Sequence, residues 1–124
     1  MDQRVEEAAT KVIGAAIEVH KILGPGYLDS VYEEALAVEL SLRDITFSRQ
    51  LTFALDYKGH KIGEGRMDFL MDGCLVVELK AVEALAPIHT AQAISYLKAT
   101  KHRLALLINF NVPVLKDGIK RVAL

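Results

Sequence analysis

The spacing of apolar residues changes near residue 43, and this change constrains the fold more than any other feature of the chain. Before it, apolar side chains recur every three or four residues, which predicts amphipathic helices; after it, they alternate with polar ones, which predicts strands. The expected elements are helices over about residues 4–22, 29–43 and 87–100, and strands over about 49–57, 62–71, 74–81 and 103–110, with a last short strand from Lys120. This order predicts an α/β fold around a mixed sheet.

Length, charge and cysteine content narrow the class of protein. The 124 residues make one domain, 1–124, whose 52% hydrophobic content suffices for a packed core. A net charge of −1 gives no overall positive field, so nucleic-acid binding would need a local basic patch. The single cysteine, Cys74, excludes an internal disulfide and a Cys-rich zinc site. No apolar run approaches the roughly 18 residues of a membrane span and no signal-peptide pattern is present, so we expect a cytoplasmic protein with no membrane partner.

The second predicted helix has an apolar stripe and a possible start signal. We assign to its inner face the residues Val31, Ala35, Val38 and Leu42. Ser30 and Glu33 have the spacing of a capping box, in which two side chains bond the free amides at a helix start. Glu33 therefore has a structural interpretation beside any functional one.

Charged residues stand among apolar ones in the strands on either side of Asp72-Gly73. In both strands the odd positions are apolar, and the charges fall on even positions: Arg66, Asp68, Glu78 and Lys80. Side chains alternate between the two faces of a strand, so the two apolar faces must point the same way to share a core. A two-residue loop would set odd positions against even ones, whereas a three-residue loop of residues 71–73 keeps the apolar faces together.

That three-residue loop fixes where the charges lie. It pairs Leu70 with Cys74, so that Asp68 lies opposite Val76 and diagonal to Glu78. Diagonal neighbours in a sheet are about 7–8 Å apart. The charges are then either the solvated face of a hairpin or a site in which two carboxylates and an ammonium share one cation and one phosphate.

Metal-dependent hydrolysis of a phosphodiester would use all three charged side chains. Mg²⁺ prefers oxygen ligands, which Asp68, Glu78 and the carbonyl of Leu79 could supply. The metal would lower the pKa of a bound water and shield the phosphate oxygens. Lys80 would orient that water or stabilise charge in the transition state.

The same residues carry a family resemblance. "MDF", followed by "ELK" with Asp68 and Glu78 ten positions apart, resembles the D…(D/E)xK signature of the PD-(D/E)XK nuclease superfamily. Similarity to the GxxExxY family of small prokaryotic proteins in that superfamily extends over "GAAIEVHKILGPGYLDSVYEEAL", "EGRMDFL", "VVELKAVEALAPIHTAQAISYLKAT" and "LLINFNVPVLKDGIKR", with Asp29 in place of the name-giving glutamate. The resemblance implies a restriction-endonuclease-like core of helix, three strands, helix and strand, preceded by an extra helix.

The resemblance also implies roles for individual residues. Asp68 and Glu78 would bind metal, and Lys80 would be the catalytic lysine. Glu33 aligns with an acidic residue that many members supply from this helix as a further ligand, with the capping box as the alternative. Gln92 and Tyr96 resemble the QxxxY motif, whose residues approach the active site and the nucleic acid.

Three hypotheses about function follow. The first is an enzyme, a nuclease dependent on Mg²⁺ or Mn²⁺ that hydrolyses nucleic acid, with DNA as the expected substrate and a homodimer favoured by the small size of one domain. The second is a catalytically weak module that binds nucleic acid or protein and retains the nuclease fold, which the near-neutral charge would suit. The third is a regulatory domain that binds metal without hydrolysis and would tolerate loss of Lys80.

Overall fold

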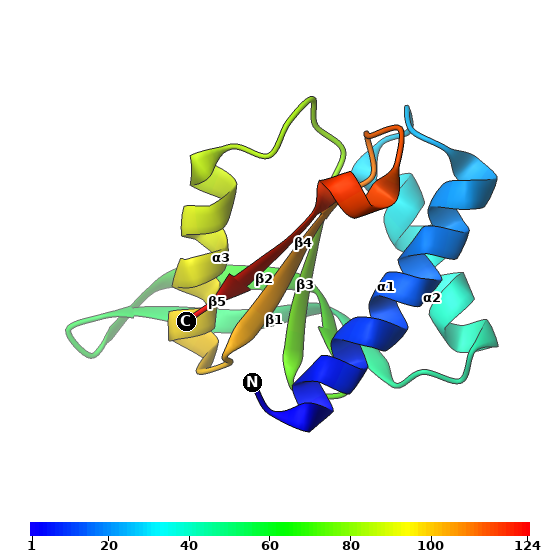
Figure 1. The fold of residues 1–124 in the computed structure, drawn as a ribbon. Helices are drawn as coiled ribbons and strands as arrows, with labels where there is room; N and C mark the ends of the chain where they lie inside the picture. The colour runs from blue at the N-terminus through cyan, green and yellow to red at the C-terminus, as the bar shows by residue number, and fades with distance from the viewer.

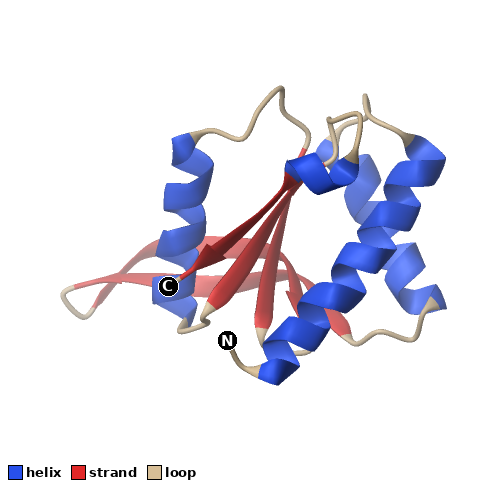
Figure 2. Cartoon of the chain, viewed as in Figure 1, coloured by secondary structure: helices blue, strands red, loops and turns tan.

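A five-stranded mixed sheet separates two helical layers in the computed structural model, which describes all of residues 1–124 (Figure 1). The helices are α1 (Gln3–Leu23), α2 (Asp29–Leu42), α3 (Pro87–Thr100) and the 3₁₀ turn η1 (Leu115–Gly118). The strands are β1 (Phe47–Tyr57), β2 (His60–Met71), β3 (Leu75–Lys80), β4 (Leu104–Asn109) and β5 (Ile119–Ala123). Their spatial order follows the sequence, and only β3 and β4 run parallel, with α3 as the crossover between them (Figure 2). The predicted α/β, restriction-endonuclease-like order with an extra N-terminal helix is confirmed.

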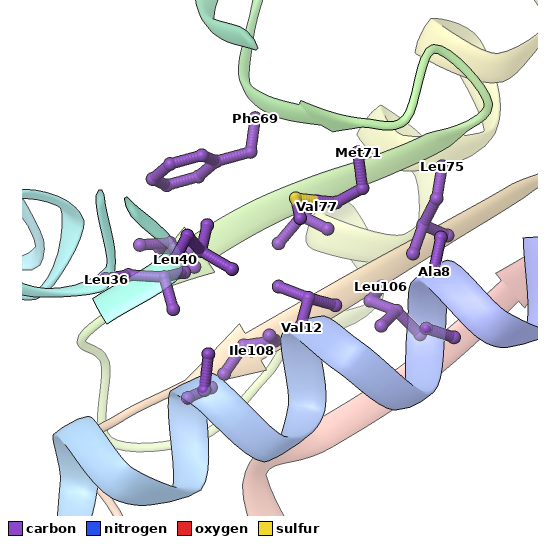
Figure 3. Packing of buried hydrophobic residues seen from close by; sticks show 14 of the residues in the cluster. Ala8, Val12, Leu36, Leu40, Phe69, Met71, Leu75, Val77, Leu106 and Ile108 are labelled. Atoms are coloured by element: carbon purple, nitrogen blue, oxygen red, sulfur yellow. The ribbon is translucent and has the colours of Figure 1, made fainter. Parts of the chain in front are cut away.

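The two faces of the sheet have separate hydrophobic cores. The larger core packs α1 and α2 against the sheet, with Ala8 of α1 beside Leu75 and Leu106 (Figure 3). The smaller core lies under α3 and includes Leu97 and Val76. Strands β3 and β4 are therefore covered on both faces, which explains their nearly continuous apolar sequence. None of the helices is both long enough and apolar enough to cross a membrane.

Helix α2 buries a different side from the one predicted. Its core contacts come from Tyr32, Leu36, Ala37 and Leu40, whereas the stripe assigned to the inside is largely exposed. Tyr32 decides the orientation: its ring stacks on Phe110 with centroids 4.5 Å apart, and its hydroxyl donates to the carbonyl of Gly24. The face of α2 with the larger side chains, which include an aromatic ring, is therefore the buried one. The prediction that Val31, Ala35, Val38 and Leu42 form the inner face is wrong.

The predicted capping box is also absent. Leu28 is the N-cap of α2 and makes no side-chain capping bond, so Ser30 already lies within the first turn. Glu33 makes its hydrogen bonds to side chains of the following strand instead.

The β2–β3 hairpin keeps odd positions paired with odd ones, but its register is two residues from the prediction. Leu70 pairs with Val76, not with Cys74. Asp72 and Gly73 both have positive φ, 49° and 67°, a geometry that Asp-Gly favours, and Cys74 is the extra unpaired residue of the loop. This shift brings Asp68 opposite Glu78 instead of diagonal to it.

A kink at Gln50 divides the β1–β2 hairpin into two halves. Gln50 has a φ of 50°, and the pairing is interrupted between Arg49–Phe69 and Leu51–Met67. As a result Phe69 faces the α1–α2 core whereas Met67 faces the α3 core. The prediction that these two residues share one face is therefore wrong. Beyond the kink, the outer half of the hairpin extends away from the sheet (Figure 1).

Candidate active site

Asp68 and Glu78 tie β2 to β3 where the backbone ladder between these strands stops. The last paired residues are Phe69 and Val77. Next along, the N–H of Asp68 donates to Oε2 of Glu78 over 3.0 Å, and the N–H of Leu79 donates to Oδ2 of Asp68 over 2.8 Å. Each carboxylate thus bonds the backbone of the opposite strand with one oxygen, which holds the two side chains together at the end of the ladder.

The Glu78 carboxyl is buried beside another carboxylate. Its residue is only 5% exposed. Burial raises the pKa of Glu78 most, the charge of Asp68 raises it further, and the Asp68 amide and Lys80 oppose the shift, with a resulting pKa of about 8. Glu78 therefore holds its proton at neutral pH even beside Lys80, and a further positive charge at this place would favour its ionised form.

Lys80 reaches from the end of β3 toward α3. It is half-buried and follows Glu78 by two residues, so both side chains leave the same face of the strand. Its Nζ donates to Oε1 of Gln92 over 3.4 Å, which joins the lysine to the first half of α3. Gln92 is itself exposed, so its amide is accessible from solvent.

Asn109 fixes the loop that connects Lys80 to α3. This side chain at the end of β4 is almost fully buried. Its Oδ1 accepts from the Val82 N–H over 3.1 Å and its Nδ2 donates to the Val82 carbonyl over 2.9 Å. The Lys80 carbonyl is held in turn by the N–H of Phe110. The end of β3 is therefore rigid on the side that carries the lysine.

Tyr96 lies one turn beyond Gln92, in the core beneath α3. Its ring meets Phe53 edge-on with centroids 4.9 Å apart. Burial raises the pKa of the Tyr96 phenol most, and the negative charges of Glu78 and Asp68 raise it further. The contact that places the Tyr96 ring is with Phe53 of β1, beneath α3.

A polar pocket of about 360 Å³ opens beside Asp68. Its lining comes from the start of α2, the kink of β1 and strands β2 and β3: Asp29, Ser30, Glu33, Gln50, Arg66, Asp68 and Leu79. Only one of these residues is hydrophobic. The fold thus brings Glu33 and Asp68, which are far apart in the sequence, to one pocket, with Glu78 behind Asp68.

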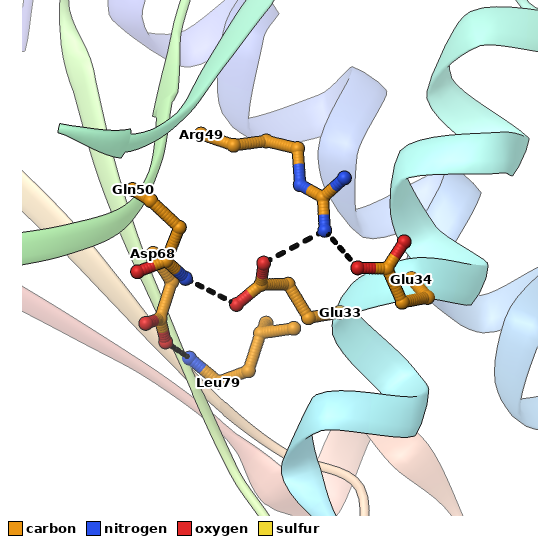
Figure 4. A network of polar contacts seen from close by, with 6 residues as sticks. All are labelled: Glu33, Glu34, Arg49, Gln50, Asp68 and Leu79. Carbon is orange, nitrogen blue, oxygen red and sulfur yellow. Dashed lines mark hydrogen bonds and ion pairs between the residues drawn. The ribbon is translucent and has the colours of Figure 1, made fainter.

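Glu33 is held by two residues of β1. Arg49 donates to it over 2.8 Å and also pairs with Glu34, and the amide of Gln50 donates to the other Glu33 oxygen (Figure 4). The side-chain oxygen of Gln50, Oε1, is buried without a hydrogen-bond partner. Because the amide nitrogen must face the Glu33 carboxylate, this oxygen is directed away from it.

The donor set fits a hard divalent cation with few protein ligands. No group of three or more His, Cys, Asp or Glu side chains is arranged to hold a metal ion. Asp68 and Glu78 form a carboxylate pair with one oxygen of each not used to bond the opposite strand. Mg²⁺ typically takes one or two carboxylates and completes its shell with water and substrate phosphate, which this pair beside an open pocket allows.

A comparison with protein families agrees with this arrangement of residues. The family model described as the PD-(D/E)XK nuclease superfamily matches residues 6–122, nearly the whole chain. The chain belongs to the PD-(D/E)XK nuclease superfamily. Among curated proteins and solved structures, none matches the chain significantly. The narrower resemblance to the GxxExxY family remains a prediction.

Asp68 lies in β2, and Glu78 and Lys80 lie in β3, so the three residues that resemble the D…(D/E)xK signature come from adjacent strands. Sequence reasoning missed Arg49 and Gln50, which hold Glu33. One signal was present, because Arg49 occupies an odd position in a strand whose other odd positions are apolar. Nothing in the sequence indicated the kink that turns Gln50 toward the pocket.

Proposed function

We propose that this protein is a metal-dependent nuclease that hydrolyses phosphodiester bonds of DNA in the cytoplasm, with residues 1–124 acting as one catalytic domain. The observation that carries the proposal is the pairing of two carboxylates, Asp68 and Glu78, each bonded to the other strand, at the edge of a polar pocket. Lys80 stands two residues away on the same face. Membership of the PD-(D/E)XK nuclease superfamily supports the same chemistry.

Asp68 and Glu78 are the proposed ligands of Mg²⁺ or Mn²⁺, with the carbonyl of Leu79 as a further oxygen donor. When bound, such a cation would lower the pKa of water and neutralise charge on the phosphate. Glu33 is the proposed third carboxylate, because it lines the same pocket as Asp68. To bind the cation, Glu33 would have to give up its bonds to Arg49 and Gln50. We therefore expect it to bind the cation more weakly than Asp68 and Glu78 do.

Lys80 is the proposed catalytic lysine. Its ammonium can orient the attacking water or stabilise the negative charge that develops on the phosphate in the transition state. Gln92 holds that ammonium and, being exposed, is placed to contact the DNA as well. Tyr96 is the second proposed substrate contact. Arg66 lines the pocket and is exposed, so it offers a positive charge for a neighbouring phosphate.

A cleavage assay tests this function. The wild type and three variants are incubated with single-stranded, duplex and supercoiled DNA and with RNA, in Mg²⁺, Mn²⁺ or EDTA. Glu78→Gln and Lys80→Met remove a charge from the site while keeping most of the side-chain volume. Glu83→Gln, at an exposed loop position, is the matched control for the loss of one carboxylate.

We expect the wild type and Glu83→Gln to cut DNA only with a divalent cation, and Glu78→Gln and Lys80→Met to lose at least about a hundredfold in rate. Cleavage of RNA but not of DNA would support the proposed chemistry and show that the substrate is RNA. Cutting that survives both site substitutions, or no cutting on any substrate, would contradict the assignment. In the second case, retained DNA binding would favour the catalytically weak binding module.

A further inference from the structure

Helix α2 exposes an apolar stripe on the side that faces away from its core. The stripe consists of the N-cap residue and four helical residues: Leu28, Val31, Ala35, Val38 and Leu42. Ala35, at its centre, is partly buried against the larger core, and the other four are exposed. Leu28 and Leu42 are each 74% exposed and Val38 is 60% exposed. Four large or branched apolar side chains on one helix face are more than scattered surface residues, and such a patch typically marks an interaction site.

The stripe is self-complementary. Along the helix its residues are leucine, valine, alanine, valine and leucine, with spacings that alternate between three and four. The order of residue types is the same in both directions, and Leu28 and Leu42 both lie seven positions from Ala35. A two-fold interface uses the same patch on both chains, so an antiparallel pair of α2 helices with its axis near Ala35 would bring Leu28 of one copy to Leu42 of the other. The small alanine at the centre would allow the two helix backbones to approach closely.

The charges beside the stripe are partly compensated within one chain: Glu39 has its own partner, whereas Glu34 shares Arg49 with Glu33. Glu34 pairs with Arg49 over 2.5 Å, and Glu39 pairs with Arg43 over 2.7 Å. In an antiparallel two-fold pair, the same edge of each helix meets its own copy, so an unpaired glutamate near the axis would be repelled. These internal ion pairs weaken that repulsion.

A hollow of about 420 Å³ lies at the C-terminal end of the stripe. Its lining includes Val38 and Leu42 of α2 and Phe47 of β1, and most of its lining side chains are hydrophobic. In the antiparallel arrangement this is the place where Leu28 of the second copy arrives. Its apolar side chains therefore offer contacts to a leucine that is otherwise largely in solvent, beside the Glu34–Arg49 ion pair that lines the same hollow.

We propose that the exposed stripe of α2 is a homodimer interface, in which α2 of a second copy packs antiparallel to the first. The pairing leaves the polar pocket open, because Glu33 points from the opposite side of α2 at 3.6 residues per turn. One helix pair with its surroundings is smaller than the roughly 800 Å² per partner of a standard interface, so the dimer forms and dissociates with concentration. The proposal does not depend on nuclease activity.

Sedimentation velocity of the full chain over a wide concentration range tests the interface. Val38→Arg introduces a charge near the centre of the stripe, and Ile62→Arg makes the same kind of change at a 66% exposed position on the distant β1–β2 hairpin. We expect the wild type and Ile62→Arg to dimerise as concentration rises, and Val38→Arg to associate at least about tenfold more weakly. Circular dichroism and thermal melting show whether each variant is folded.

Cross-linking tests the antiparallel geometry. In a Cys74→Ser background, Ala35→Cys lies next to its own copy across the proposed axis, so a short thiol cross-linker gives a covalent dimer, whereas Ile62→Cys does not. A wild type that is monomeric at every concentration overturns the proposal, and the stripe would then bind a partner other than a second copy of the chain. Equal association of Val38→Arg and the wild type, or no cross-link at Ala35→Cys in a chain that does dimerise, also overturns it.

Discussion

The Glu78→Gln substitution should make the protein more stable while it removes activity. In the folded chain the Glu78 carboxyl has a pKa of about 8, against an ordinary value of 4.5 that applies to the unfolded chain. Between these two values the unfolded state releases the proton and the folded state keeps it, so the folded state binds more protons. Stability that is fully present below pH 4.5 is therefore lost progressively as the pH rises toward 8.

The size of the effect follows from the shift. One pKa unit corresponds to about 1.4 kcal/mol, so the carboxyl costs about 3 kcal/mol of stability at pH 7 and roughly 4 kcal/mol at pH 8. Because Asp68 is in contact, these values belong to the carboxylate pair as a whole. In Glu78→Gln the amide oxygen can still accept from the Asp68 N–H, and the amide nitrogen can donate to the Asp68 carboxylate. The variant should therefore escape this loss of stability.

Urea unfolding of both proteins in EDTA at pH 5, 6, 7 and 8 measures the difference directly. The free energy of unfolding should fall with pH more steeply for the wild type than for Glu78→Gln, and the gap should reach about 3 kcal/mol at pH 7. Glu83→Gln, at an exposed position, should follow the wild type. Parallel pH profiles for the wild type and Glu78→Gln would refute the reasoning, because the Glu78 pKa would then be the same in the folded and unfolded chain.

Two further predictions concern the support of Lys80, the proposed catalytic lysine. Gln92→Ala, which removes the only side-chain bond to the Lys80 ammonium, should lower kcat by about tenfold without changing the melting temperature, and an unchanged kcat would show that this contact does not position the lysine. Asn109→Ala removes the two buried bonds to Val82, so it should lower the free energy of unfolding in urea by about 2 kcal/mol and also lower the cleavage rate. Asn111→Ala, at an exposed position with one long bond to the same carbonyl, should change both little. Equal losses in the two variants would contradict the role of Asn109.

The element order and the strand positions of Asp68, Glu78 and Lys80 were predictable because both depend on local pattern. The switch from helical to alternating spacing marks the boundary between α2 and β1, and Asp68, Glu78 and Lys80 are recognisable as charges within apolar strands. The alternation of apolar and charged residues alone showed that odd-numbered positions of β2 pair with odd-numbered positions of β3. It could not give the register, because pairings two residues apart have the same parity, and only the geometry of Asp72 and Gly73 selects one of them.

The remaining errors arise where tertiary packing decides between local alternatives. Helix α2 has two apolar stripes, and the choice between them depends on Tyr32 stacking against Phe110, a residue far along the chain. The positive φ of Gln50 reverses the faces of β1 and β2 within two residues, and no glycine marks the place. The surroundings of Glu33 depend on both of these features, so its partners, Arg49 and Gln50, could not be identified in advance.

Calorimetric titration with Mn²⁺ at pH 7, carried out in two buffers of different ionisation enthalpy, tests the assignment of the Asp68–Glu78 pair most directly. Because Glu78 has a pKa of about 8 in the folded chain, cation binding at this pair must displace its proton. The wild type should therefore bind Mn²⁺ and release close to one proton, and Glu78→Gln should bind at least about tenfold more weakly and release none. Equal Mn²⁺ affinity of the two proteins, or binding by the wild type without proton release, would contradict a metal site at these carboxylates.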